Sequence, residues 1–187
     1  MDEKAKERSI DDCLCRMRDG DTAALAPLYD CTHRQLYSLC YSYFRNRADS
    51  EDALSETYLH IQTNAAKFKG SGGYMWISTM AKNICLNMLK RERRAVSVDF
   101  TDEATENFFG ERMAEPPETN AEGNELAELA KSVLNEKEFR IVILHAVSGQ
   151  KFRAIAELVG GLETTVRWQY NNALKKLRKE CERRGIR

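Results

Sequence analysis

The chain has 187 residues, of which 42% are hydrophobic and 31% are charged, and its formal net charge is zero. This composition is typical of a globular protein with one large domain or two small ones. No run of about 18 apolar residues is present, and the charged start lacks the apolar core of a secretory signal. We therefore expect a cytoplasmic protein without membrane insertion.

The neutral total conceals three segments of different charge. Residues 1–95 carry 15 basic and 13 acidic side chains, residues 96–124 carry 1 and 8, and residues 125–187 carry 13 and 8. Because charges act over only about 10 Å at ordinary salt, each segment presents its own field. A basic C-terminal segment indicates either a polyanionic partner or a solvated helical surface.

Six cysteines are scattered through helix-like segments and form no compact disulfide framework, so reduced thiols are expected. An enzyme or zinc site would have to use Cys13, Cys15 and His33. This is disfavoured because the Cys-x-Cys pair lacks the second close ligand pair of structural zinc sites. We expect no catalytic residue, metal or cofactor.

Apolar residues recur at three- and four-residue steps from the start of the chain, which predicts amphipathic helices and an all-α fold. The first examples are Ile10, Leu14 and Met17, followed by Leu36, Leu39, Cys40 and Tyr43. No strand alternation is evident.

The segment 49–68 is predicted to be a helix that starts at Asp49 as its N-cap. Its apolar stripe is Ala53, Leu54, Tyr58, Ile61 and Ala65. Asp52 and Glu56 lie one turn apart on the outer side. They either complement the helix N-terminus and solvate the helix, or form an acidic patch for a basic protein partner.

A glycine-rich loop, KFKGSGG, leads into a predicted helix over residues 74–94. Its expected inward residues are Ile77, Met80, Ala81, Ile84, Cys85 and Met88. A second face carries a ring, amides and cations that can bind unpaired bases and phosphates: Trp76, Thr79, Asn83, Asn87, Lys90 and Arg94. The alternative is that Trp76 completes the core.

Residues 96–124 are predicted to form an acidic flexible linker, because Pro116 and Pro117 disfavour a continuous helix. Fully extended, this segment would reach roughly 95 Å, and as a coil it would average about 30 Å.

The C-terminal segment is predicted to contain a helix-turn-helix. A helix starts at residues 134–136 with Phe139, Val142, Ile143, Ala146 and Val147 inward. A second helix over 151–159 ends at Gly160 and Gly161, and a third starts at Glu163. The outward residues of the third helix are Thr165, Arg167, Trp168, Asn171, Asn172 and Lys175. Arginine and asparagine side chains read guanine and adenine in the major groove.

The order of these motifs resembles bacterial RNA polymerase sigma factors of the extracytoplasmic-function (ECF) type, which keep sigma regions 2 and 4. The resemblance rests on SEDALSETYLHI, FKGSGGYMWISTMAKN and IAELVGGLETTVRWQYNNALKKLR. It implies a region 2-like domain over 1–95, a linker over 96–124 and a region 4-like domain over 125–187. Together these would bind core polymerase and promoter DNA and start transcription.

The resemblance also implies roles for particular residues. Asp52 and Glu56 would dock on core polymerase. The minus-ten element would be opened and read by Phe68, Lys69, Ser71, Tyr74, Trp76, Thr79, Asn83, Asn87 and Lys90. The minus-thirty-five element would be read by Thr165, Arg167, Trp168, Asn171, Asn172 and Lys175. An anti-sigma factor is a further implied partner. The alternative is a free-standing helix-turn-helix regulator whose N-terminal domain senses a ligand or protein.

Overall fold

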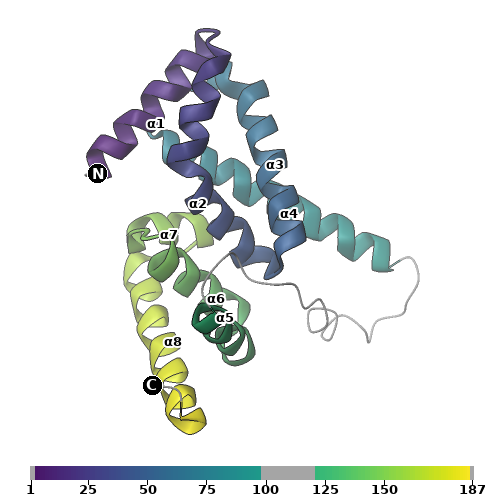
Figure 1. Ribbon diagram of the computed structural model, residues 1–187, viewed down its shortest axis with the longest axis vertical. Coiled ribbons are helices and arrows are strands. Elements are labelled where there is room, and N and C mark those ends of the chain that lie inside the picture. The colour runs from purple at the N-terminus through teal and green to yellow at the C-terminus, as the bar shows by residue number, and fades with distance from the viewer. Residues whose placement is uncertain (1–2, 98–120, 186–187) are drawn as a thin grey trace.

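The computed structural model describes residues 3–97 and 121–185, where every regular element is a helix (Figure 1). The expected all-α fold is confirmed. The first lobe contains α1 (Glu3–Arg18), α2 (Leu25–Phe44), α3 (Arg47–Asn64) and α4 (Gly73–Ser97). The second lobe contains α5 (Ala121–Val133), α6 (Glu136–Val142), α7 (Phe152–Val159) and α8 (Glu163–Arg184).

The apolar stripes expected for α3 and α4 form the core of the first lobe. Ala53, Ile61, Ile77 and Ala81 are fully buried, and they belong to one cluster with Leu36 of α2. Each helix contacts its neighbours in the bundle because its stripe repeats at the helical period. The outward faces of α3 and α4 are therefore fixed by what their inward faces bury.

The start of α3 differs from the expectation that Asp49 is its N-cap. The N-cap is Asn46, whose side-chain oxygen accepts a hydrogen bond of 2.9 Å from the backbone N–H of Asp49. Asparagine caps helices as well as aspartate does. The helix thus starts one turn earlier, and Asp49 lies in its first turn.

Gly73 allows α1 and α4 to approach closely. Its N–H donates a hydrogen bond of 2.7 Å to the carboxylate of Asp11 in α1. A Cβ atom at Gly73 would lie 2.6 Å from the Asp11 Oδ1 and 2.7 Å from the Leu14 Cδ1. A side chain at this position would therefore force the two helices apart.

We expect Gly73→Ala to destabilise the protein by about 1–2 kcal/mol, because overpacking a tight contact shifts backbone or side chains. Urea denaturation measures the change. Gly161→Ala is the matched control, since an added Cβ there meets no described atom within 4 Å. Equal midpoints for the two variants would contradict the role given to Gly73.

The expected linker lies largely outside the described residues, which omit 98–120. At its two ends, α4 extends to Ser97 and α5 begins at Ala121, so helices occupy both edges of the 96–124 range. Helix α5 was not expected. It packs on α8, and its Leu129 and Ala130 are buried.

Helix α6 begins with a capping box. The Asn135 side chain accepts from the Glu138 N–H, and the Glu138 carboxylate accepts from the Asn135 N–H. This agrees with the expected start at residues 134–136. Lys176 of α8 donates to the same carboxylate at 2.7 Å, so the cap also ties α6 to α8.

The expected burial of Ala146 and Val147 is wrong, because both are exposed. After α6 the chain continues through a π-helical turn, Ile143–Val147. The wider turn shifts the side chains away from the 3.6-residue period. Leu144 is fully buried in this turn, although the expected inward residues did not include it.

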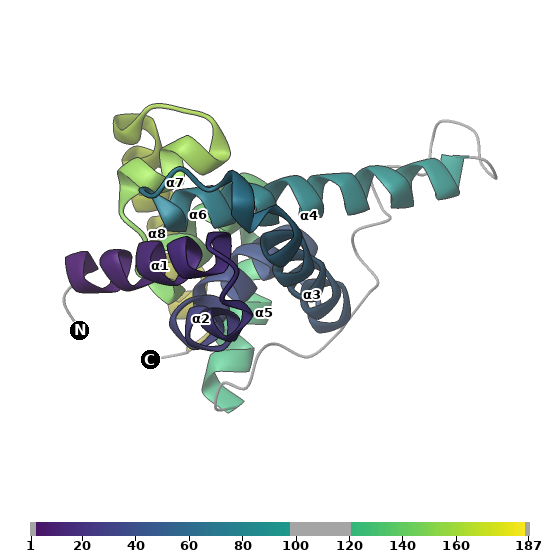
Figure 2. The same ribbon diagram turned by 90° about the horizontal axis from the view of Figure 1, so that it is seen from above.

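The two lobes pack against each other, an arrangement the sequence pattern did not predict. Helix α2 contacts α6 and the π-helical turn, and α4 contacts α7. One buried cluster combines first-lobe residues with Ile141, Leu144 and Ile155 of the second lobe. Figure 2 shows α4 running from this contact and projecting beyond the rest of the bundle.

Aromatic rings and cations line this contact, which we call the interlobe seam. Tyr41 of α2 is buried among second-lobe residues, with its ring 6.4 Å from that of Phe139. The Arg140 guanidinium lies 3.8 Å from the Tyr43 ring centroid, and that of Arg45 lies 4.5 Å from the Phe139 centroid. Cation–π contacts of this kind are directional, so they fix how the lobes meet.

Candidate nucleic-acid interface

The acidic pair of α3 lies on the outer surface of the first lobe. Asp52 is exposed and Glu56 is partly exposed. The Glu56 carboxylate is 3.9 Å from the His60 imidazole one turn later. The two carboxylates thus share one face of the helix, as their four-residue spacing requires.

Leu59 lies on the same face, and sequence analysis missed it. It is 63% exposed, and its spacing from Asp52 and Glu56 puts it one turn along that side of α3. A leucine on an otherwise polar helix face was the available signal. An exposed apolar side chain flanked by carboxylates is typical of a protein docking surface.

The loop before α4 is held by Phe68, which is 4% exposed. Its ring lies 5.4 Å from that of Trp76, which is itself partly buried. The ring of Phe68 therefore anchors the base of the loop and is not on the surface in this conformation. Lys69 and Ser71 are exposed at the tip, and Gly70 and Gly72, on either side of Ser71, adopt positive φ.

The second face of α4 is formed largely as its spacing predicts. Thr79, Asn83, Asn87 and Lys90 are all exposed on it. Trp76 stands at its beginning with one side against Phe68 and the core. The face therefore offers two amides, a hydroxyl and a cation in a row along a projecting helix.

Tyr74 departs from the expected exposure at the start of α4. Burial raises the pKa of its hydroxyl to about 12, although nearby Ser78 and Gln150 favour the ionised form. Gln150 belongs to the second lobe, so Tyr74 faces the other lobe rather than solvent.

The outward face of α8 contains the six residues expected there. Thr165, Arg167, Trp168, Asn171 and Lys175 are exposed, and Asn172 is half-buried. Trp168 is 64% exposed, which is unusual for so large an apolar ring. Arg167 forms an ion pair of 2.8 Å with Glu163, so it would exchange this partner on binding DNA.

An aromatic cluster holds α8 on α7. The His145 ring stacks at 4.0 Å on Phe152 and meets the Tyr170 ring edge-on at 4.7 Å. The backbone carbonyl oxygen of Gln150 is 2.8 Å from His145 Nδ1. These contacts fix the angle between the two helices, and so the direction of the outward face of α8.

The thiol or zinc site that the sequence disfavours is not assembled within residues 3–97 and 121–185. Cys13 is buried, His33 stacks on Tyr29, and no group of three or more metal-binding side chains occurs in this part of the chain. None of the helices described there combines the length and apolar character that a membrane span needs.

Comparison with known proteins shows which family the chain resembles. Residues 28–95 match the Sigma-70 region 2 family. The ECF RNA polymerase sigma factor SigK of Mycobacterium tuberculosis is 31% identical over 86 residues, which cover 45% of this chain and 46% of SigK. The ECF sigma factor SigX of Bacillus subtilis is 22% identical over 160 residues, covering 83% and 82% of the two chains. The chain is therefore similar to ECF sigma factors, and its residues 28–95 match their region 2.

Solved structures of sigma factors have a similar fold. CnrH, solved in complex with the cytosolic domain of CnrY, has a TM-score of 0.66 at 16% identity and covers 93% of this chain and 97% of its own. RpoE from Bartonella quintana, solved with the anti-sigma factor NepR, has a TM-score of 0.60 at 16% identity, covering 77% and 88%. The chain spans about half the length of the SigK relatives that it matches. The family as a whole consists of transcription initiation factors.

Proposed function

We propose that the chain is an ECF sigma factor that binds core RNA polymerase and directs it to promoters, where it helps to open the DNA. The observation that carries this proposal is the presence of outward amide and cationic faces on two helices of one chain, α4 and α8. Aromatic rings stack on the bases of single-stranded DNA, and amide and cationic groups bind its polar groups and phosphates. Amide and cationic side chains also read base edges in the major groove of duplex DNA.

The two faces have different targets in this proposal. The loop 68–74 and the outer face of α4 bind the opened minus-ten element, with Trp76 and Asn83 against unpaired bases. The outer face of α8 binds the minus-thirty-five element as duplex. The region 2-like domain comprises 1–95, and the region 4-like domain comprises 125–187.

The face of α3 with Asp52, Glu56 and Leu59 is the proposed contact with core polymerase. An anti-sigma factor is the proposed inhibitor, by analogy with the one solved on RpoE of Bartonella quintana. Cytoplasmic location follows from this function, because polymerase and chromosome are there.

We expect Asp52→Ala with Glu56→Ala to weaken binding to core polymerase by about tenfold while helicity is unchanged. Exposed charges at an interface contribute complementarity to a basic partner and little to fold stability. Fluorescence anisotropy with labelled polymerase measures the affinity, and circular dichroism measures the fold.

The matched control is Asp12→Ala with Glu182→Ala, which removes the same charge from exposed positions on α1 and α8. Equal loss in both double variants would show a general charge effect and refute docking through α3. If the unmodified chain did not bind polymerase at all, a free-standing helix-turn-helix regulator would be the better description.

A further inference from the structure

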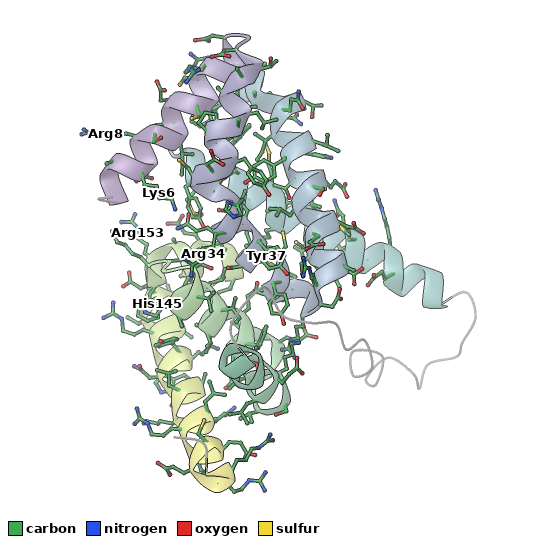
Figure 3. The ribbon with its side chains drawn as sticks, viewed as in Figure 1. Lys6, Arg8, Arg34, Tyr37, His145 and Arg153 are labelled. Atoms are coloured by element: carbon green, nitrogen blue, oxygen red, sulfur yellow. The ribbon has the colours of Figure 1, made fainter. Side chains whose placement is uncertain are left out.

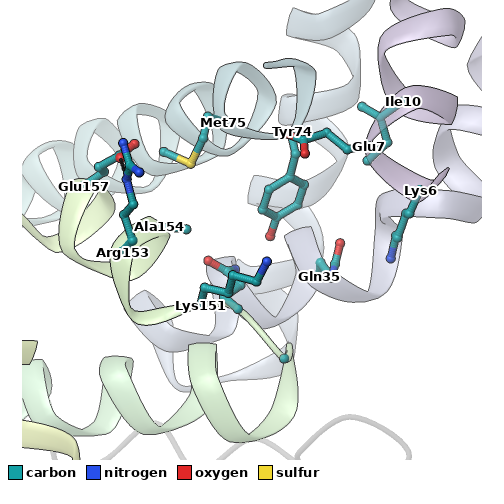
Figure 4. A pocket seen from close by; sticks show the side chains of 12 residues that line it. Lys6, Glu7, Ile10, Gln35, Tyr74, Met75, Lys151, Arg153, Ala154 and Glu157 are labelled. Carbon is teal, nitrogen blue, oxygen red and sulfur yellow. Dashed lines mark ion pairs between the residues drawn. The ribbon is translucent and has the colours of Figure 1, made fainter. Parts of the chain in front are cut away.

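A cavity of about 380 Å³ lies where the two lobes meet, between α1, the start of α4 and the start of α7. Figure 4 shows side chains from both lobes around it, including Tyr74 and Gln35 from the first and Lys151 from the second. This volume is within the range of small-molecule sites. The promoter and polymerase faces proposed above do not use it, apart from Tyr74.

Two polar groups that line the cavity are buried and lack hydrogen bonds. Gln150 is 5% exposed, and neither its side-chain nitrogen Nε2 nor its side-chain oxygen Oε1 has a hydrogen-bond partner in the described part of the chain. The buried hydroxyl of Tyr74 lies near Gln150 but likewise makes no hydrogen bond of ordinary geometry. Leaving buried polar groups unpaired is unfavourable, so a polar ligand between them would gain hydrogen bonds that these groups lack.

The charge around the cavity favours an anion. Lys6, Lys151 and Arg153 line it, against Glu7 and Glu157. The Arg153 guanidinium is 3.6 Å from the Glu157 carboxylate, so this carboxylate has a cation beside it and repels an anion in the cavity less. The first turns of α4 and α7 also contribute lining residues, and helix N-termini carry partial positive charge.

The remaining wall is apolar and comes from both lobes. Ile10 and Met75 line it from the first lobe, and Ala154 lines it from the second. A bare inorganic ion would leave this wall unused, whereas an anion with a carbon skeleton would cover it.

We propose that the cavity binds a small organic anion, such as a di- or tricarboxylate, through Gln150, Tyr74 and Lys6. Because both lobes line the cavity, the ligand binds the packed arrangement and stabilises it over one in which the lobes separate. Binding itself does not depend on the proposed function. Its consequence, an inhibited sigma factor at high ligand concentration, does rest on that function.

Titration calorimetry of the purified full chain with citrate tests the site, without polymerase or DNA. We expect saturable one-to-one binding at micromolar to millimolar concentration, and weaker binding of inorganic phosphate at the same ionic strength. Lack of saturable citrate binding would overturn the proposal. Equal affinities for citrate and phosphate would overturn the organic character of the ligand.

Lys6 and Arg8 provide a matched pair of variants on α1. Figure 3 shows Lys6 directed toward the second lobe and Arg8 directed away from it. Lys6→Gln should weaken citrate binding by about threefold to fivefold, as for a partly exposed ion pair. Arg8→Gln should leave the affinity unchanged. The same affinity in both variants would contradict the site.

Gln150→Leu should weaken citrate binding by about tenfold, because it removes the buried hydrogen-bonding group from the wall. Circular dichroism must first show that this variant is folded. If it is not, Lys6→Gln carries the test, since Lys6 lies at the surface. Because these measurements contain no polymerase, their failure is separable from failure of the proposed function.

Discussion

Asn171→Ala is expected to relax the preference for one base pair of the minus-thirty-five element, at a cost of about 1–3 kcal/mol for the preferred base. Asn171 is exposed on α8, on the side opposite the buried Val166 and Ala173. An asparagine amide reads adenine through paired hydrogen bonds, so its loss removes discrimination at a single position. Asn172→Ala should act in the same way at a neighbouring position.

The measurement is binding of the full chain with core polymerase to duplexes that differ by single base pairs upstream. Lys175→Ala is the control, because a phosphate contact should weaken every duplex equally and flatten the dependence on salt. If Asn171→Ala lost the same affinity for every duplex, base reading would belong to other residues of α8.

In the proposed function, Trp168 and Leu162 would lie close to the DNA that α8 binds. Leu162 is the N-cap residue of α8 and is 72% exposed, and Trp168 is 64% exposed. Both sit on the part of the helix that enters a major groove first in helix-turn-helix proteins. In the proposed complex these two apolar side chains would contact thymine methyl groups in the major groove.

The elements that could be predicted from the sequence are those whose patterns are local. The apolar stripes of α3 and α4 and the glycine turn at Gly160 follow from helical periodicity and from positive φ at that glycine. The exposed faces of α4 and α8 could also be predicted, because the residues that do not belong to the buried stripe of a helix lie on its outer side.

The features that escaped prediction depend on contacts distant in sequence or on backbone irregularity. The π-helical turn at Ile143–Val147 breaks the 3.6-residue period, and for this reason the expected burial of Ala146 and Val147 is wrong. Helix α5 is stabilised by packing on α8, and its acidic start resembled a linker. The burial of Tyr74 is caused by the other lobe, which no local pattern encodes.

The interlobe seam contains polar and charged side chains whose burial is energetically unfavourable. Burial raises the pKa of the Tyr37 hydroxyl to about 12 and lowers the pKa of the Arg45 guanidinium. The Tyr37 hydroxyl, Arg45 Nη2 and Arg140 Nε have no hydrogen-bond partner in residues 3–97 and 121–185. Water would satisfy these atoms if the lobes separated, which offsets part of the stabilisation that burial gives to the packed arrangement.

Separation of the lobes is a requirement of the proposed function. Promoter elements about 25 base pairs apart, at roughly 3.4 Å per base pair, lie near 85 Å from each other. In the packed arrangement α4 contacts α7, and we propose that the outward faces of α4 and α8 then lie too close together to reach both elements. The packed arrangement therefore competes with promoter binding.

We expect Tyr41→Ala to separate the lobes and to strengthen promoter binding by the chain with core polymerase. Tyr41 is 3% exposed, and its buried neighbours include Phe139, Leu134 and Ala173 of the second lobe. Truncating it removes about 3 kcal/mol from the packed arrangement while leaving the first-lobe cluster intact. At about 1.4 kcal/mol for each tenfold, the ratio of separated to packed molecules rises by about a hundredfold.

Small-angle X-ray scattering measures the radius of gyration, which should increase in Tyr41→Ala. Tyr29→Ala on the same helix is the matched control, because Tyr29 is 44% exposed and contacts Tyr58 and His33 within the first lobe. Its radius of gyration should equal that of the unmodified chain. If Tyr41→Ala remained compact and bound promoter no more tightly, the seam would be a permanent part of the fold, and the two reading faces would have to act without separating.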